Sequence, residues 1–250
     1  MSENPLLPHR KLKELHTLML RCRELEQKQQ RVQKSSAKRA QTAREALLAA
    51  TSIHLLPGDH IFAAPGDLTA PQLAPAPKAT AKSKTKFTAP EAVPPAPELS
   101  RFALAAATAH GLKSAGTDAL VLSYAHAGSL EPGWQAALEW AHRNQFPLLI
   151  AVADATGSQK PATNPSIITW NATSRLAQRT KLPILTVDGE DAVAVYRAMQ
   201  EAVIRARFAG GPAILWGMMT PSTTAALPRT QQPIARLNQY LKVRKIVLPK

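Results

Sequence analysis

The polar residues that could carry out chemistry fall in four segments, and each directly follows an apolar run of strand length. The segments are 124–133, 153–164, 187–191 and 217–224. In an open sheet of parallel strands, ligands bind beyond the carboxyl ends of the strands. If the four apolar runs pair in parallel, these segments share one edge of the sheet. That edge is where a ligand site is expected.

Several common catalytic motifs are absent from the sequence. It contains no phosphate-binding Walker loop, no glycine-rich dinucleotide fingerprint after a strand, and no nucleophilic serine flanked by glycines. Glu190 and Asp191 follow Gly189 at a predicted helix start, where capping of exposed backbone N–H groups explains them. The single cysteine, Cys22, can form neither an internal disulfide nor a thiol-based zinc site.

Other residues of chemical interest have structural interpretations. His110 and His142 lie on predicted helices without a metal-binding partner, so we interpret them as exposed or structural. The four tryptophans are interpreted as core or interface residues. They are Trp134, Trp140, Trp170 and Trp216.

The second half of the chain alternates apolar runs with helical patterns. Predicted strands cover 118–125, 146–154, 182–189 and 211–219. Predicted helices cover 101–116, a stretch starting near 134, 166–181 and 191–210. This alternation predicts parallel pairing through right-handed crossovers. The expected fold is therefore an α/β, doubly wound parallel sheet with helices on both faces.

The sequence divides into three parts. Residues 1–62 are predicted to form an N-terminal helical arm, with helices at 12–32 and 40–53 and a short strand opening at Ile61 and Phe62. Residues 63–98 contain eight prolines with many Ala, Thr and Lys residues, a composition typical of a flexible linker. Residues 99–250 form the α/β domain, which closes with a helix whose Ile234, Leu237, Leu241 and Val243 are expected to pack on the body.

The charge is strongly positive, with 31 Lys and Arg against 17 Asp and Glu in 250 residues, a formal net charge of +14. The excess lies at the two ends and in the linker rather than among aromatic residues, which disfavours specific nucleic-acid recognition. No apolar run approaches the about 20 residues needed to cross a bilayer, so no membrane association is expected. The first residues lack the apolar region of a secretory signal, and we expect a cytoplasmic protein.

The order of these segments resembles a known family, the alpha subunit of the thiamine-diphosphate-dependent 2-oxo acid dehydrogenases of the pyruvate and branched-chain type. The resemblance rests on the stretches 12–28, 44–62, 101–124, 134–154, 182–219 and 232–246. Together they cover most of 9–62 and 99–245. The resemblance implies a thiamine-diphosphate-binding fold, thiamine diphosphate and Mg²⁺ as cofactors, and pairing with a beta-type subunit or a homo-oligomer.

The same resemblance shows what this chain lacks. The family binds Mg²⁺ and the diphosphate through a Gly-Asp-Gly turn after one strand and an Asn about thirty residues later. Here the turn falls at 125–127, with His126 in place of the carboxylate, or one residue later beside Gly128. The Asn falls at Ala155, with Asp154 adjacent. His126, Gly128 and Asp154 are thus the candidate residues of a degenerate cofactor site, and no metal ligand or catalytic residue is predicted.

Three functions follow as hypotheses. The first is an alpha-subunit-like protein that keeps the fold but is a non-catalytic or structural subunit, a pseudoenzyme, with weak or absent cofactor binding. The second is an active thiamine-diphosphate-dependent oxidoreductase that decarboxylates a 2-oxo acid and transfers the acyl group to lipoyl. In that case His126, Gly128 and Asp154, or a partner chain, must supply the metal site. The third is a basic binding module for nucleic acid or an acidic protein.

Overall fold

Five parallel strands form one sheet in the order β1-β2-β3-β5-β4. The computed structural model describes residues 7–32, 44–64, 67–75, 100–129, 133–155, 165–220 and 232–248. The strands are β1 (His60–Phe62), β2 (Val121–His126), β3 (Leu148–Asp154), β4 (Ile184–Asp188) and β5 (Ala213–Met218). All four strands predicted in the second half are present, and the predicted short strand at 61–62 forms one edge of the sheet.

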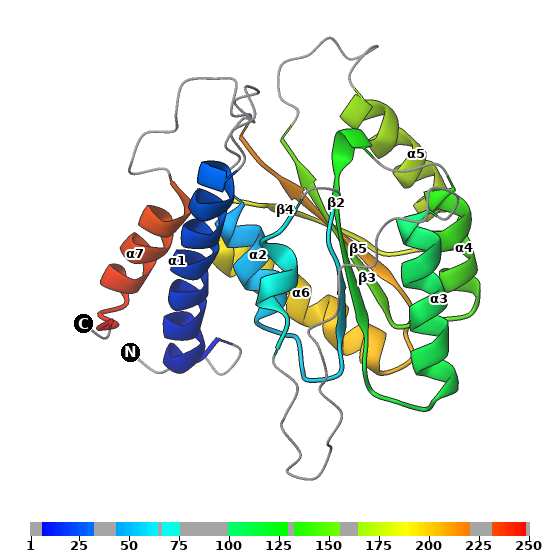
Figure 1. Cartoon of the computed structure of the whole chain (residues 1–250), viewed down its shortest axis with the longest axis horizontal. Coiled ribbons are helices and arrows are strands. Elements are labelled where there is room, and N and C mark those ends of the chain that lie inside the picture. Colours follow the sequence, from blue (N-terminus) through cyan, green and yellow to red (C-terminus); the bar gives the residue numbers. More distant parts are fainter. Residues whose placement is uncertain are drawn as a thin grey trace.

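Helices cover both faces of this sheet, as Figure 1 shows. One face carries α1 (His9–Val32), α2 (Glu45–Ser52), α6 (Ala192–Arg207) and α7 (Pro233–Val243). The other carries α3 (Arg101–Ser114), α4 (Trp134–Arg143) and α5 (Pro165–Thr180). We call these the α6 face and the α3 face. The doubly wound α/β fold predicted from the alternating pattern is confirmed.

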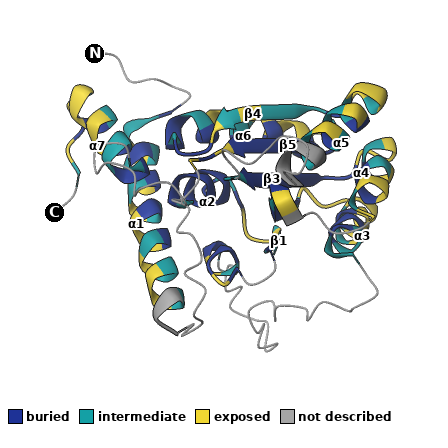
Figure 2. Ribbon diagram, turned by 90° about the horizontal axis from the view of Figure 1, so that it is seen from above, coloured by how far each residue is buried: buried dark blue, intermediate teal, exposed yellow. Residues whose placement is uncertain are grey.

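The central strands are buried on both sides, so neighbouring side chains belong to different cores. In β3, Leu149, Ala151 and Ala153 pack in the core of the α6 face. Leu148, Ile150 and Val152 pack in the core of the α3 face. This alternation follows from the pleat of a strand, which points successive side chains to opposite faces. Figure 2 shows β3 as a buried strand between the helical layers.

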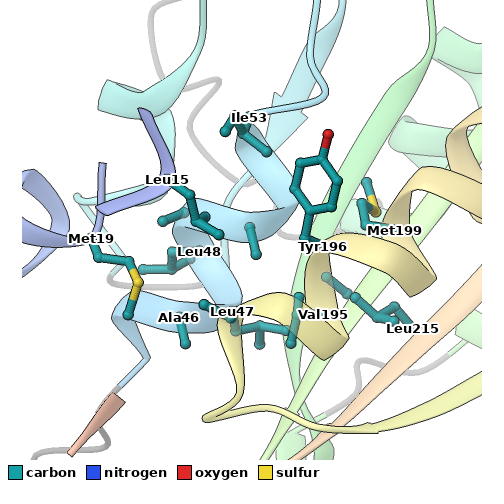
Figure 3. Packing of buried hydrophobic residues seen from close by; sticks show 14 of the residues in the cluster. Leu15, Met19, Ala46, Leu47, Leu48, Ile53, Val195, Tyr196, Met199 and Leu215 are labelled. Atoms are coloured by element: carbon teal, nitrogen blue, oxygen red, sulfur yellow. The ribbon is translucent and has the colours of Figure 1, made fainter. Parts of the chain in front are cut away.

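The N-terminal segment contributes directly to the core of the α6 face. Leu47 and Leu48 of α2 and Val195 and Met199 of α6 belong to one buried cluster, and Figure 3 shows Leu47 beside Val195 where the two helices meet. On the outer side of α2, Leu15 and Met19 of α1 are fully buried. Burial of each such side chain stabilises the fold by about 1.5–3 kcal/mol. Residues 45–62 are therefore an integral part of the sheet and its covering layer.

Part of the segment predicted as a linker is packed rather than extended. Residues Ala70–Leu73 form a short 3-10 helix, η1, in which Ala70 and Leu73 are buried. Asp67, just before it, is also buried, and its Oδ1 accepts hydrogen bonds from the backbone N–H groups of Thr69 (2.9 Å) and Ala70 (3.2 Å). The composition of 63–98 did not predict this anchoring. Residues 76–99 lie outside the described ranges.

A network of charged side chains joins α1, α2 and the η1 segment. Arg44 donates to Glu26 Oε1 at 2.9 Å and to Asp67 Oδ2 at 3.0 Å. Arg23 forms an ion pair with the buried Glu45. Burial raises the pKa of Glu26 to about 7; Arg44 lowers it in part, and the nearby Glu45 and Asp67 raise it further. The helical arm is thus docked through a carboxyl group that titrates near neutral pH.

Because the Glu26 pKa is higher in the folded chain than its ordinary value of 4.5, folding takes up a proton between pH 4.5 and 7. This group therefore lowers the free energy of unfolding as the pH rises through that window. Between pH 4.5 and pH 7 the charging of Glu26 should lower the free energy of unfolding of the wild type by on the order of 3 kcal/mol. E26Q has no such group, so its free energy of unfolding should rise relative to that of the wild type over the same range. Urea denaturation across this range measures the difference. Glu24→Gln, at an exposed position of α1, is the control. The prediction would be contradicted if the difference in unfolding free energy between E26Q and the wild type did not vary with pH.

Candidate functional site

The candidate residues His126 and Asp154 lie on neighbouring strands at the carboxyl edge of the sheet. His126 is the last residue of β2 and pairs with Ala153 of β3, one residue before Asp154. Asp154 in turn pairs with Met218, the last residue of β5. The sequence-based expectation that these loops share one edge is met. Both side chains are half-buried.

The two side chains nevertheless point to different faces. His126 follows the alternation of Leu122 and Tyr124, which pack in the core of the α6 face. Asp154 follows Ile150 and Val152, which pack in the core of the α3 face. Adjacent backbones therefore do not bring the imidazole and the carboxylate together on one side of the sheet.

Ala155, where the family's Asn falls, lies on the same face as His126. Its methyl group packs against the core of the α6 face, next in alternation to Ala153. Positions 126 and 155 thus lie on the same face, at the ends of the neighbouring strands β2 and β3. They offer an imidazole, a poor ligand for Mg²⁺, and a methyl group, which cannot bind a metal.

Asp154 is held in a hydrogen-bonded aromatic group on the α3 face. Its Oδ2 accepts a hydrogen bond from Nε1 of the fully buried Trp216 at 2.9 Å. The Trp216 ring packs edge-on against Trp170 of α5, with ring centroids 5.0 Å apart. The backbone oxygen of Asp154 also accepts from the N–H of Met219 at 2.8 Å. A tryptophan N–H can only donate, so this contact occupies one of the about four lone-pair sites of the carboxylate.

Gly128 lies in a short 3-10 helix, η2 (Ala127–Ser129), which directly continues β2. Gly128 is exposed, whereas Ala127 is buried in the core of the α3 face. The turn packs against α5 and the end of β3. The structure therefore places Gly128 at the same edge as Asp154, but the backbone of η2 is part of a helical turn.

A second polar group lies at the carboxyl end of β4. Asp191 caps α6 by accepting from the N–H groups of Val193 (2.9 Å) and Ala194 (3.1 Å), which confirms its predicted capping role. The buried Glu190 accepts instead from the N–H of Thr220 at 2.8 Å, beyond the end of β5. Arg236 of α7 donates to Asp188 Oδ2 at 2.7 Å.

Arg236 forms ion pairs with Asp188 and Asp191, and the sequence analysis did not predict this role. Burial alone would raise the pKa of Asp188, but hydrogen bonds from Arg236 and from the N–H of Glu190 bring it below its ordinary value. Arg236 lies 48 residues after Asp188 on a different helix, and no local spacing relates the two. The group joins β4, β5, α6 and α7, which is a structural role.

His110 and His142 make structural contacts, and Cys22 lies in the core of the α6 face. The His110 ring packs against Phe146 with centroids 5.0 Å apart, beside Trp140. His142 Nε2 donates to the carbonyl oxygen of Thr180 at 2.6 Å. Cys22 is buried, and this burial raises the pKa of its thiol. The tryptophan prediction holds for the buried Trp216, whereas Trp140 is 41% exposed.

Within the described ranges, no group of three or more His, Cys, Asp or Glu side chains is arranged to hold a metal ion. No helix in that part of the chain is long and apolar enough to cross a bilayer. At the carboxyl edge, the described Asp154, Asp188, Glu190 and Asp191 each accept hydrogen bonds from the protein itself. Among the described residues, these four carboxylates are thus each engaged by backbone or side-chain donors of the chain.

Comparison with known proteins gives one family match. Residues 166–220, which run from α5 to the end of β5, match the model of the dehydrogenase E1 component family. No curated protein matches the chain.

Among solved structures, the chain is similar to one described as a thiamin diphosphate-dependent enzyme from Mycobacterium smegmatis. The identity is 16% and the TM-score 0.48, over 76% of this chain and 34% of the other. A transketolase from Pichia stipitis, solved with xylulose 5-phosphate, is 12% identical with a TM-score of 0.36, over 58% of this chain and 27% of the other. The chain thus spans about a third of the length of these structures or less.

Proposed function

We propose that this chain is a dehydrogenase E1 alpha-like protein that keeps the thiamine-diphosphate-binding fold as a scaffold and has lost the metal-diphosphate site. It acts as a non-catalytic, structural subunit. The match of residues 166–220 to the E1 family model supports the family assignment. Within the described residues, the order of strands and helices agrees with the resemblance found in the sequence.

The observation that carries this proposal is the placement of three residues at the ends of β2 and β3. His126 and Ala155 share the α6 face, where a pair of oxygen ligands would be needed. Asp154 is the carboxylate next to Ala155 in the sequence. It lies on the α3 face and accepts a hydrogen bond from the Trp216 N–H. Recruiting Asp154 would require β3 to rotate its last residue and break that hydrogen bond. The described residues at these strand ends do not fit Mg²⁺ and a diphosphate, and no catalytic step follows from them.

The assembly of the protein follows from the same proposal. An alpha-like scaffold would pair with a beta-type subunit or with a second copy of itself. Neither pairing requires the cofactor, because a fold can keep its assembly surfaces after its chemistry is lost. A cytoplasmic location is proposed with it.

Isothermal titration with thiamine diphosphate and Mg²⁺ tests the proposal directly. We expect no binding heat from the wild-type chain up to millimolar cofactor, because a diphosphate without its bridging cation lacks most of its charge compensation. The double variant His126→Asp and Ala155→Asn places two oxygen ligands on the α6 face and should gain Mg²⁺-dependent binding. Asp154→Ala is the matched control and should leave the wild-type result unchanged.

Micromolar binding by the wild type would overturn the scaffold proposal. If that binding were abolished both by His126→Ala and by Asp154→Ala, the active oxidoreductase with an altered metal site would replace it.

A further inference from the structure

The end of α7 presents apolar side chains to solvent next to basic ones. Val243 is 68% exposed and Val247 is 78% exposed. Lys242 and Lys245 beside them are also exposed. The expectation that Val243 packs on the body is wrong, whereas Ile234, Leu237 and Leu241 are buried as predicted. We call Lys242, Val243, Lys245 and Val247 the tail surface.

The backbone of the tail surface is fixed by a helix C-cap. Lys245 has a left-handed φ of 56°, its N–H donates to Lys242 at 3.0 Å, and the N–H of Ile246 donates to Leu241 at 3.0 Å. This reversal turns Ile246 into the core, where it is 8% exposed. The valines on either side are thereby held outward on an ordered segment, so a partner would pay little conformational entropy to bind them.

The end of α7 is basic. Glu201 is the last acidic residue of the chain, and residues 232–248 contain four Lys and Arg residues, of which Arg236 pairs with Asp188 and Asp191. Another of the four, Arg244, lies over the Tyr240 ring at 4.9 Å. α7 runs beside α1 in the opposite direction, so its last turn lies at the same end as the basic first turns of α1 (Figure 1). The tail surface is thus an apolar pair within a basic region.

We propose that the tail surface binds an acidic, amphipathic helix of a partner protein, whose carboxylates pair with Lys242 and Lys245 and whose apolar side chains cover Val243 and Val247. The net charge of +14 makes a second copy of this chain a repulsive occupant. Nucleic acid is bound mainly through phosphate contacts and through bases stacked on aromatic side chains, and Tyr240, the aromatic residue of α7, is already covered by Arg244. Interfacial membrane helices carry Trp, Phe or Leu on their apolar face, not isolated valines.

Fluorescence anisotropy with the full chain tests this surface. The probe is a labelled helical peptide with Leu at two positions of each heptad and Glu at most others. It should bind the wild type, and binding should weaken as salt is added. Lys242→Gln with Lys245→Asn should weaken binding about fivefold, since two exposed ion pairs are lost. Asn at 245 tolerates the left-handed backbone. Val243→Ser with Val247→Ser should weaken binding at least as much.

The matched control is Arg175→Gln with Lys181→Asn, which removes two exposed charges on the α3 face and should leave binding unchanged. Thermal midpoints of all variants within a few degrees of the wild type show that folding is intact. Equal binding by wild type and tail variants would overturn the proposal. So would binding of an oligo-glutamate peptide as tight as that of the Glu/Leu peptide. Tighter binding of a DNA duplex or of anionic phosphatidylglycerol vesicles, lost in the same variants, would assign the surface to another kind of polyanion.

Discussion

Replacing Arg207 with Met should lower the free energy of unfolding by about 3–5 kcal/mol, because it leaves a buried carboxylate without its partner. The Asp59 side chain is 1% exposed and lies 2.5 Å from the Arg207 guanidinium. Its Oδ1 also accepts from the N–H of Leu120 at 2.9 Å, directly before β2. The pair therefore joins the end of α6 to the starts of β1 and β2. It lies at the amino ends of the strands, whereas the candidate site lies at their carboxyl ends.

Urea denaturation followed by circular dichroism measures this loss. Arg205→Met is the matched control, because Arg205 is exposed on the same turn of α6 and its loss should change stability by less than about 0.5 kcal/mol. Equal effects of the two substitutions would show that the ion pair contributes nothing specific. A double-mutant cycle with Asp59→Asn would then separate the pair from the packing of the arginine chain.

Replacing Arg44 with Met should also cost about 3–5 kcal/mol at pH 8, since it leaves Glu26 and Asp67 buried without their shared cation. The Arg44 side chain is 14% exposed, so water can only partly compensate. The loss should be smaller at pH 5. There Glu26, whose pKa is about 7 even with Arg44 present, takes up a proton and carries no charge.

The measurement is the difference in unfolding free energy between wild type and R44M at pH 5 and pH 8. Lys28→Met, at an exposed position of α1 half a turn from Glu26, is the control and should show a small difference that does not depend on pH. A loss for R44M that is larger at pH 5 would contradict the role assigned to Glu26.

The local pattern of the sequence was sufficient for the architecture. Apolar runs of strand length alternate with helical periods from 99 onward, and parallel pairing with helices on both faces follows from that alternation. The placement of His126 and Asp154 at the same edge of the sheet follows as well, because the carboxyl ends of parallel strands lie at one edge. The capping role of Asp191 depends only on its nearest neighbours along the chain, so it too was predictable.

The dockings between distant segments were not predictable in this way. Arg44 and Asp67 are buried together although one precedes a short helix and the other lies in a proline-rich stretch. That outcome depends on which surface lies opposite, and local composition does not contain that information. Val243 is a different case: it lies two residues after Leu241, about half a turn around α7, so the helical period itself places it away from the buried face.

The sequence by itself determined the layered parallel sheet, the edge that carries the candidate residues, and the histidine at position 126 directly after the predicted strand 118–125. Only the tertiary structure decided that His126 and Ala155 lie on one face while Asp154 lies on the other, bound to Trp216. The physical reason is that β3 is buried on both faces, so its apolar run is nearly continuous and carries no polar alternation to mark them. Which face a side chain joins is then set by the helices that pack against the strand.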